Sequence, residues 1–232
     1  MRMLVLMPTF NERENIETSI SQVLSANQDL DLLIIDDNSP DGSGELANQI
    51  SKKNSRVSVL HRSTKEGLGK AYIAGFEWAK AHNYNFVIQM DADGSHQPKD
   101  LGKLIAKAKQ NRVVIGSRWI TGGEVLNWPW YRMAISRAGN FYARKVLKTN
   151  IMDMTAGYRL YSVEDLSKLD LIDIRAHGYG FQVEMTLLAI DQGLEVIEVP
   201  ISFIERVVGK SKMTLAIVIE AFWLCTKWGI RR

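Results

Sequence analysis

The chain has 232 residues, of which 46% are hydrophobic and 24% are charged, and both values lie near the averages for globular proteins. This composition excludes a disordered or low-complexity chain, and the length suits one large domain. The formal net charge of +3 is too small to indicate a nucleic-acid-binding protein. Because Cys225 is the sole cysteine, the chain has no internal disulfide and no cysteine-based zinc site.

The apolar run at the N-terminus ends at Pro8, and charged residues follow soon after. A signal peptide needs a longer apolar core and a cleavage site of small residues, so we interpret the run as a first strand. A membrane-spanning helix needs roughly 18–20 uninterrupted apolar residues. The nearest candidate, residues 215–230, is interrupted by Glu220 and Lys227 and does not meet this requirement.

The first half of the chain alternates short apolar runs with amphipathic segments. This alternation predicts an α/β fold in which helices cover both faces of a parallel sheet. The strands are expected over residues 4–7, 32–35, 57–60, 85–90 and 113–115. A first helix is expected to end near residue 26, and further helices are expected over residues 44–53, 71–81 and 98–109. Asn11 or Asn15 can cap the first helix.

Polar clusters follow four of these strands. They are residues 36–43, 61–70, 91–94 and 116–118. In an open parallel sheet the ligand lies outside the carboxyl ends of the strands. The repeated clusters therefore predict one large site along that edge, suited to an anionic, metal-bound ligand.

The cluster Asp91-Ala92-Asp93-Gly94 directly follows an apolar strand. Two carboxylates at positions i and i+2 can converge on one hard cation, and Mg²⁺ and Mn²⁺ both accept oxygen ligands. Aspartate and glycine are also ordinary turn residues, so the spacing alone leaves a plain polar turn open. Gly67 and Gly69 would let a phosphate approach the backbone, although their pattern is not a Walker A loop.

Aromatic and basic residues are interleaved around Trp128, Trp130 and Arg132, ahead of a helix expected over residues 137–148. This pattern is typical of a core helix with a solvated basic face, and also of a surface that lies at a membrane interface. A polar turn is expected over residues 152–159.

Towards the C-terminus, residues 178–184 lead into a helix that ends at residue 189, and a last strand is expected over residues 195–203. The basic loop at residues 209–212 is either solvated or closes over an anion. The final amphipathic helix, residues 215–230, either packs on the domain or lies on a membrane surface.

Six motifs in this order resemble the inverting GT-A glycosyltransferases of family 2, and most nearly the dolichyl- or polyprenyl-phosphate mannose synthases. The motifs are residues 8–12, 35–43, 67–69, 90–96 and 116–118, and Arg206 with residues 209–212. The resemblance implies a Rossmann-like GT-A catalytic domain over residues 1–212. It also implies a C-terminal amphipathic, membrane-interfacial helix over residues 213–232.

The resemblance further implies roles for individual residues. The nucleotide-sugar-binding group is Pro8, Asn11, Glu12, Asp37, Gly69, Asp91 and Ala92. The acceptor-phosphate-binding group is Arg118, Arg132, Ser136, Arg206 and Lys212. Asp91 and Asp93 are the implied ligands of Mg²⁺ or Mn²⁺, and with Arg118 and Arg206 they form the implied catalytic set. Where some relatives have a metal-binding glutamine, this chain has Ser95. Gln182 and Glu184 match an acceptor-side helix.

The implied activity is inverting transfer of mannose from GDP-mannose to dolichyl or polyprenyl phosphate, which gives a β-linked lipid product and GDP. A lipid monophosphate is already an anionic nucleophile near neutral pH, because its second pKa is about 6, so no general base is needed. Catalysis would then consist mainly of positioning and electrostatic stabilisation.

Three alternatives remain open. They are a related enzyme with another donor such as UDP-glucose, a nucleotidyltransferase that releases pyrophosphate, and a catalytically silent subunit. Many relatives carry transmembrane helices after the catalytic domain, and this chain stops without them. The resemblance therefore implies a cytoplasmic protein, peripheral on the cytoplasmic face of a membrane, which binds directly or through a separate anchoring subunit.

Overall fold

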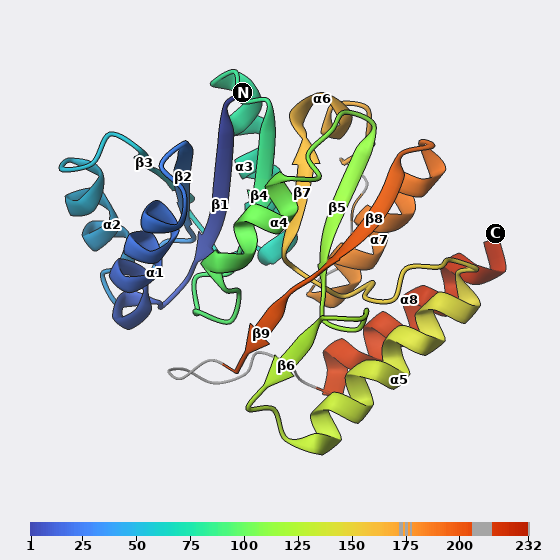
Figure 1. Cartoon of the computed structure of the whole chain (residues 1–232). Coiled ribbons are helices and arrows are strands. Elements are labelled where there is room, and N and C mark those ends of the chain that lie inside the picture. The colour runs from blue at the N-terminus through green and yellow to red at the C-terminus, as the bar shows by residue number, and fades with distance from the viewer. Residues whose placement is uncertain (172–173, 175, 177, 206–214, 232) are drawn as a thin grey trace.

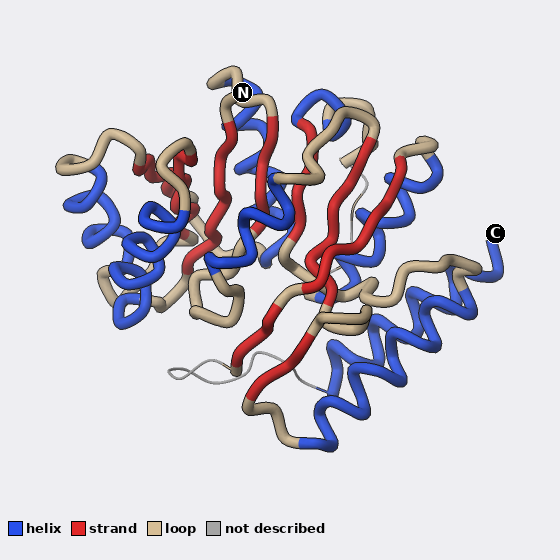
Figure 2. Tube along the Cα trace, in the orientation of Figure 1, coloured by secondary structure: helices blue, strands red, loops and turns tan. Residues whose placement is uncertain are grey.

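The computed structural model describes residues 1–171, 174, 176, 178–205 and 215–231. A twisted central sheet divides the molecule, with helices on both of its sides (Figure 1). A second, small sheet lies beside helices α5 and α8, away from the N-terminus (Figures 1 and 2). The prediction of an α/β fold with a mostly parallel sheet is confirmed.

The central sheet has seven strands in the order β3-β2-β1-β4-β7-β5-β8. In that order they are Val57–His61, Leu30–Asp36, Met3–Thr9, Phe86–Gln89, Arg159–Ser162, Arg112–Ser117 and Glu195–Pro200. All neighbours pair in parallel except β7, which is antiparallel to both β4 and β5. The second sheet pairs β6 (Glu124–Leu126) with β9 (Ser202–Ile204) in parallel.

The helices are α1 (Arg13–Ala26), α2 (Ser43–Ser51), α3 (Leu68–Ala81), α4 (Leu101–Ile105), α5 (Trp130–Val146), α6 (Val163–Leu166), α7 (Tyr179–Asp191) and α8 (Leu215–Arg231). Side chains alternate between the two faces of each strand, so the sheet supports two apolar cores. Leu4 and Leu6 of β1 join the core with α3 and α7. Met3 and Val5 join the core with α1 and α4.

Three predicted elements differ from the structure. The helix predicted over residues 137–148 begins earlier, at Trp130, because Pro129 precedes it with a fixed φ of −58° and starts the helix there. The strand predicted over residues 195–203 is two strands, β8 and β9, which belong to different sheets. The helix predicted over residues 98–109 consists of a 3₁₀ turn and α4, and it ends at Ile105.

Strand β7 was not predicted, since residues 152–159 were interpreted only as a turn. It has four residues and begins with Arg159, which is fully buried. Its guanidinium donates to the backbone oxygens of Met154 and Ala156 at 2.8 and 2.7 Å, and to Thr186 Oγ1 of α7 at 2.8 Å. These bonds satisfy the buried charged side chain, and they fix α7 over β7.

Helix α8 runs parallel to α5 and packs against it. The rings of Tyr142 and Phe222 stack with 3.8 Å between centroids, and Tyr142 Oη lies 2.7 Å from Thr226 Oγ1. At Gly229 a Cβ would lie 2.8 Å from the backbone oxygen of Val146, so the glycine permits close approach of the two helices. Within the described ranges, no helix is long and apolar enough to cross a membrane.

Candidate active site

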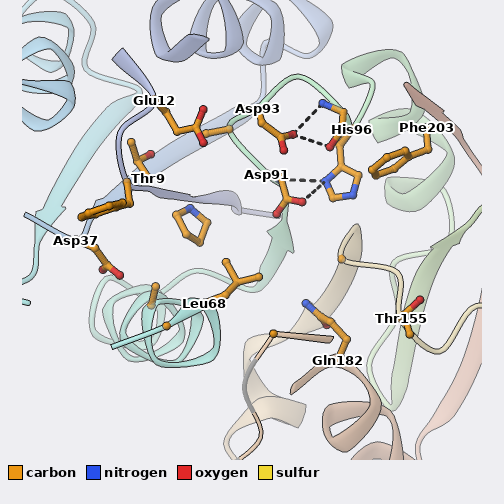
Figure 3. A pocket seen from close by; sticks show the side chains of 18 of the residues that line it. Thr9, Glu12, Asp37, Leu68, Asp91, Asp93, His96, Thr155, Gln182 and Phe203 are labelled. Atoms are coloured by element: carbon orange, nitrogen blue, oxygen red, sulfur yellow. Dashed lines mark hydrogen bonds and ion pairs between the residues drawn. The ribbon is translucent and has the colours of Figure 1, made fainter. Parts of the chain in front are cut away.

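A cavity of about 380 Å³ opens at the carboxyl ends of the central parallel strands. Its lining comes from the loops after β1, β2, β4 and β5, the start of α3, the turn before β7, and α7, together with Trp128, Arg132 and Phe203. Figure 3 shows Asp37, Asp91 and Gln182 around this space. The cavity lies at the edge of the sheet where the polar clusters predicted a site.

The loops after β1 and β2 form one end of the cavity, and Pro8, Glu12 and Asp37 line it. Arg62 Nη1 donates to Asp37 Oδ1 at 2.7 Å. Burial nevertheless raises the pKa of Asp37 above its ordinary value, although the charge of Arg62 acts in the opposite direction. Lys65 Nζ lies 3.8 Å from the centre of the Phe10 ring. This end combines an aromatic ring with buried hydrogen-bonding groups, which suits a nucleoside.

Asn11 lies outside the cavity lining. Its φ of 58° is in the left-handed region, which asparagine adopts more readily than most residues. Its N–H donates to Ser39 Oγ at 3.2 Å, and the N–H of Glu12 donates to Ser43 Oγ at 3.0 Å. Asn11 thus shapes the turn that presents Glu12, and a direct contact with the nucleotide sugar stays a prediction.

Gly69, in the first turn of α3, also lies behind the lining. A Cβ at this position would lie 2.7 Å from the Phe181 ring. The glycine therefore allows α3 and α7 to approach each other. A direct contact of Gly69 with the nucleotide sugar stays a prediction.

Hydrogen bonds from the same turn and from α1 and α3 hold the turn that carries the carboxylate pair, and Figure 3 shows those within the turn. The backbone N–H of Asp91 donates to His96 Nδ1 at 3.0 Å, and Tyr72 Oη donates to Asp91 Oδ1 at 3.4 Å. Between the two aspartates, the backbone oxygen of Ala92 accepts a 2.9 Å bond from Ser19. These contacts fix the backbone of the turn, and both Asp91 and Asp93 line the cavity.

His96 is buried in a stack of aromatic rings. Its ring centre lies 4.8 Å from that of Tyr158 and 5.5 Å from that of Phe203. Burial lowers the pKa of His96, although the charges of Asp91 and Asp93 act in the opposite direction. Burial thus favours the neutral ring, whose Nδ1 lies 3.9 Å from Asp91 Oδ2. Because Nδ1 accepts a hydrogen bond, the ring proton is on Nε2.

Ser95 takes part in the acidic turn through Asp93. Its Oγ and its backbone N–H both donate to Asp93 Oδ1, at 2.6 and 3.0 Å. The hydroxyl is thereby engaged with the carboxylate, and it orients Asp93 within the turn. Ser95 thus supports the acidic pair through Asp93.

Asp91 and Asp93 fit a divalent metal that also binds a diphosphate. Within the described part of the chain, no three His, Cys, Asp or Glu side chains gather into a metal site of their own. Mg²⁺ commonly binds through one or two carboxylates and completes its coordination with water and substrate phosphates. A pair of carboxylates facing an open cavity matches that donor set.

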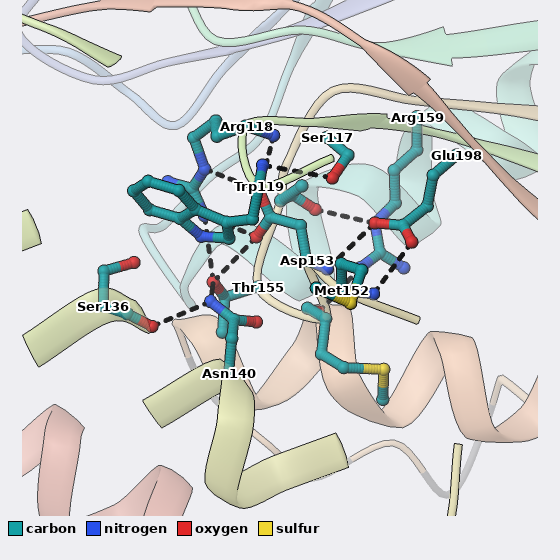
Figure 4. A network of polar contacts seen from close by, with 12 residues as sticks. Ser117, Arg118, Trp119, Ser136, Asn140, Met152, Asp153, Thr155, Arg159 and Glu198 are labelled. Carbon is teal, nitrogen blue, oxygen red and sulfur yellow. Dashed lines mark hydrogen bonds and ion pairs between the residues drawn. The ribbon is translucent and has the colours of Figure 1, made fainter. Parts of the chain in front are cut away.

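Arg118 forms a buried ion pair with Asp153 (Figure 4). Its exposed side-chain fraction is 6%, and that of Asp153 is 0%. Arg118 donates through its backbone N–H and Nε to Asp153 Oδ2 at 2.9 and 2.8 Å, and through Nη2 to Oδ1 at 2.7 Å. Nη2 also donates to Thr155 Oγ1 at 3.0 Å. Asp153 thus offsets the charge of Arg118 and fixes the orientation of the guanidinium at the cavity.

Glu198 of β8 holds the turn that carries Asp153. Its carboxylate accepts bonds from the backbone N–H groups of Met152 and Asp153, at 2.8 and 2.9 Å (Figure 4). On the other side of the turn, Asn140 Nδ2 of α5 donates to Thr155 Oγ1 at 3.2 Å. The position of Arg118 therefore depends on β8 and α5, both of which are distant in sequence.

Arg132 is the second arginine of this region. It forms a hydrogen-bonded ion pair with Glu205, and its guanidinium lies 4.1 Å from the centre of the Trp128 ring. The other cations predicted here, Arg206 and Lys212, lie outside the described residues.

A second cavity, of about 110 Å³, lies between α5, α7 and α8. It shares Arg118, Trp128, Arg132 and Thr155 with the first cavity, and its other lining side chains are mostly apolar. Ser136, predicted at the acceptor phosphate, lines this second cavity. Of the predicted acceptor residues that the structure describes, Arg118 and Arg132 line both cavities, and Ser136 lines the second.

Several lining residues had no predicted role, among them Phe10, His96, Trp128 and Phe203. Phe10 and His96 are inside quoted motifs, and the aromatic and basic texture around Trp128 gave an indirect signal. Phe203 reaches His96 because β9 pairs with β6 and forms a bridge at His96, and no local sequence signal reveals that pairing.

The chain matches known proteins over most of its length. Residues 4–170 match the sequence profile of glycosyl transferase family 2. The chain is 46% identical, over 230 residues, to undecaprenyl-phosphate mannosyltransferase of Micrococcus luteus, with 99% of this chain and 95% of that protein covered. It is 45% identical, over 232 residues, to polyprenol monophosphomannose synthase of Mycolicibacterium smegmatis, with 99% and 88% covered.

Among solved structures, the chain resembles glucosyl-3-phosphoglycerate synthase of Mycobacterium tuberculosis. A complex of that enzyme with Mn²⁺, UDP and its product superposes with a TM-score of 0.66 at 18% identity, covering 97% of this chain and 80% of that chain. This likeness confirms the GT-A fold. On the sequence matches and the fold together, the chain is a glycosyltransferase and belongs to glycosyl transferase family 2.

Proposed function

We propose that the protein transfers mannose from GDP-mannose to a polyprenyl phosphate and forms β-linked polyprenyl-phosphate mannose and GDP. The observation that carries this proposal is a cavity lined by an acidic pair and by two arginines, with a mostly apolar second cavity next to the arginines. The names of the two relatives, a mannosyltransferase and a mannose synthase that use polyprenyl carriers, support the same substrates.

The donor occupies the end between Asp37 and the acidic pair in this proposal. Pro8, Glu12 and Asp37 hold the nucleoside, while Asp91 and Asp93 hold Mg²⁺ or Mn²⁺ against the diphosphate. The metal supplies positive charge that stabilises the leaving diphosphate. Complexes of the structural relative contain UDP with Mn²⁺ or with Mg²⁺, in agreement with this cofactor assignment.

The acceptor phosphate lies at Arg118 and Arg132 in this proposal, where the two cavities join. Its oxygen attacks the anomeric carbon directly, and the bond to the diphosphate breaks on the opposite side, so an α-linked donor gives a β-linked product. The phosphate monoester needs no proton acceptor. Asp153 and Glu205 hold the two guanidiniums in place, so the charges are positioned before the phosphate binds.

The first isoprene units of the acceptor lie in the second cavity in this proposal. Its apolar lining includes Ile135, Tyr142, Val183 and Phe222, from α5, α7 and α8. This cavity begins at the arginines, so a lipid phosphate bound there can extend its chain between the helices.

Helices α5 and α8 form the membrane-facing surface in this proposal, which we place at the cytoplasmic face of a membrane, with direct or subunit-mediated attachment. Their exposed large apolar side chains are Trp130, Tyr131, Ile135, Phe141, Phe222, Trp223 and Ile230. Basic side chains accompany them, since Lys227 Nζ lies 5.0 Å from the centre of the Trp223 ring and Lys145 Nζ lies 5.8 Å from that of Phe141. Exposed tryptophan beside lysine is typical of helices that lie in the headgroup region.

The experiment combines the purified protein with Mn²⁺, undecaprenyl phosphate and one nucleotide sugar at a time. Mass spectrometry of the lipid and nucleotide products is expected to show a hexosyl lipid and GDP from GDP-mannose. If UDP-glucose gives the lipid product instead, the donor is UDP-glucose rather than GDP-mannose. Release of pyrophosphate would indicate a nucleotidyltransferase. No lipid-linked sugar from any donor would contradict the proposal.

A further inference from the structure

Gln182 combines deep burial with unpaired polar atoms. It lies near the start of α7, its exposed fraction is 1%, and it lines the main cavity. Neither Oε1 nor Nε2 of its amide has a hydrogen-bond partner in the part of the chain that is described. Buried amides are nearly always hydrogen-bonded, because a desolvated donor or acceptor without a partner is destabilising. Because Gln182 lines the cavity, a ligand bound there could supply the partners that its amide lacks.

The backbone around Gln182 is fixed. The Phe181 ring stacks on Tyr72, with 6.2 Å between centroids, and fills the space left by Gly69. Thr186 Oγ1 donates to the backbone oxygen of Gln182 at 2.9 Å and accepts from Arg159 of β7. Helix α7 is thus anchored to β7, which fixes the backbone position of Gln182 beside the cavity.

The order of the strands locates Gln182 along the site. Asp37 follows β2 and Asp91 follows β4, while α7 lies over β7, the next strand beyond β4. In Figure 3 Asp37 and Gln182 lie on different sides of the cavity, and Thr155 lies on the side of Gln182. A donor with its nucleoside at Asp37 and its diphosphate at Asp91 therefore brings its sugar towards Gln182.

The turn before β7 leaves space for that sugar. A Cβ at Gly157 would lie 3.4 Å from His96 Cε1, 3.8 Å from Asp91 Oδ2 and 3.9 Å from His96 Nε2. The absence of a side chain at Gly157 thus keeps open the region beside the acidic pair, where the anomeric carbon must sit.

The chemistry of the amide distinguishes a sugar from a phosphate. A primary amide presents a neutral donor and a neutral acceptor side by side, whereas an ionised phosphate can only accept. Two neighbouring hydroxyls of a pyranose satisfy both amide atoms, because each hydroxyl donates and accepts. We propose that Gln182 binds two adjacent hydroxyls of the transferred hexose and selects the donor sugar. This inference rests on the proposed function for the orientation of the donor.

The test compares the Gln182→Met variant with wild type by calorimetric titration of GDP-mannose and of GDP, each with Mn²⁺. Methionine keeps the length of the side chain and removes both hydrogen-bonding atoms. GDP-mannose is expected to bind about tenfold or more weakly to the variant, while the affinity for GDP changes less than about twofold. Gln192→Met, at the exposed C-terminal end of α7, is the matched control and is expected to change neither affinity.

A thermal melt distinguishes ligand binding from a structural role. Because the amide has no partner within the described residues, Gln182→Met is expected to keep or raise the melting temperature. Deoxy analogues of the donor identify the hydroxyls, since removal of a hydroxyl bound by Gln182 should cost affinity in wild type and almost none in the variant.

Equal weakening of GDP and GDP-mannose, unchanged affinity for both, or a lowered melting temperature would overturn the assignment of Gln182. Failure of the proposed function looks different, because wild type would then not bind GDP-mannose at all. In that case the nucleotide sugar that does bind replaces GDP-mannose in the same comparison. The Gln182 assignment survives only if the variant loses affinity for that sugar donor and keeps it for the free nucleotide.

Discussion

The two sides of the cavity are built in different ways. On the donor side, Asp91 and Asp93 are held mainly by neighbours in their own turn, such as Ser95 and His96. On the acceptor side, Arg118 and Arg132 are held by carboxylates 35 and 73 residues away. The two carboxylates are held mainly by bonds within residues 91–96, whereas the two arginines depend on Asp153, which Glu198 of β8 supports, and on Glu205, which follows β9. The two sides should therefore respond differently to substitution.

The largest effect is expected for Asp91→Ala or Asp93→Ala. In the proposed function, removal of either carboxylate takes away a ligand of the metal ion that would stabilise the leaving diphosphate, so turnover should fall by about 10³-fold or more. EDTA should abolish wild-type turnover in the same assay, and Asp29→Ala, in an exposed loop, is the control. Full wild-type activity in EDTA, or full activity of either variant, would contradict the proposal that Asp91 and Asp93 bind a catalytic metal ion.

A large effect on stability is expected for Asp153→Ala. The substitution leaves the Arg118 guanidinium buried without its partner, so the free energy of unfolding should fall by about 3–5 kcal/mol in urea denaturation. The control is Glu195→Ala, whose partner Arg112 belongs to a more exposed pair and for which a loss below about 1 kcal/mol is expected. Equal losses for the two variants would show that the Asp153 pair does not hold the acceptor side together.

A moderate effect is expected on membrane binding. Trp130→Ala combined with Trp223→Ala removes two exposed rings, and binding to anionic liposomes in a flotation assay should weaken by about tenfold for each ring. Lys145→Ala with Lys227→Ala should weaken binding less and in a salt-dependent manner. Lys52→Ala with Lys53→Ala, at the end of α2, is the matched control. Liposome binding that all three variants retain would exclude α5 and α8 as the membrane surface.

The smallest effect is expected at Cys225, which lines the second cavity. Burial raises the pKa of this thiol to about 11, so iodoacetamide should alkylate it slowly at pH 8 and faster as the pH approaches that value. Polyprenyl phosphate should slow alkylation several-fold at fixed pH, because its chain covers the thiol, whereas inorganic phosphate should not. Alkylation at the same rate with and without lipid would place the isoprene chain elsewhere.

The same difference between the two sides explains what the sequence could predict. The first five parallel strands, the helices before α4 and the acidic turn follow from local patterns, and they lie close to their predicted positions. Strand β7 was not predicted. It has only four residues and begins with a buried arginine, so its sequence shows no alternation of apolar and polar residues. Its pairing with β4 and β5 is determined by tertiary contacts such as those of Arg159 with α7.

The acceptor side shows the same limit. The sequence indicated Arg118 and Arg132, but not that Asp153 and Glu205 would pair with them. The start of α5 at Trp130 and the division of the last strand at Ile201 were also missed. Helix α5 lines the second cavity, and Phe203 of β9 lines the main cavity. Gln182 was predicted only in part. The family resemblance placed it on an acceptor-side helix, but its unpaired amide is visible only in the structure.

The most direct test of a cavity with separable donor and acceptor sides is a pair of titrations on three proteins. Wild type, Asp93→Ala and Arg132→Ala are each titrated with GDP in the presence of Mn²⁺, and separately with undecaprenyl phosphate in detergent micelles. Asp93→Ala is expected to lose affinity for GDP and keep the lipid phosphate, and Arg132→Ala is expected to do the reverse. Loss of both ligands in both variants, or of neither, would contradict the account.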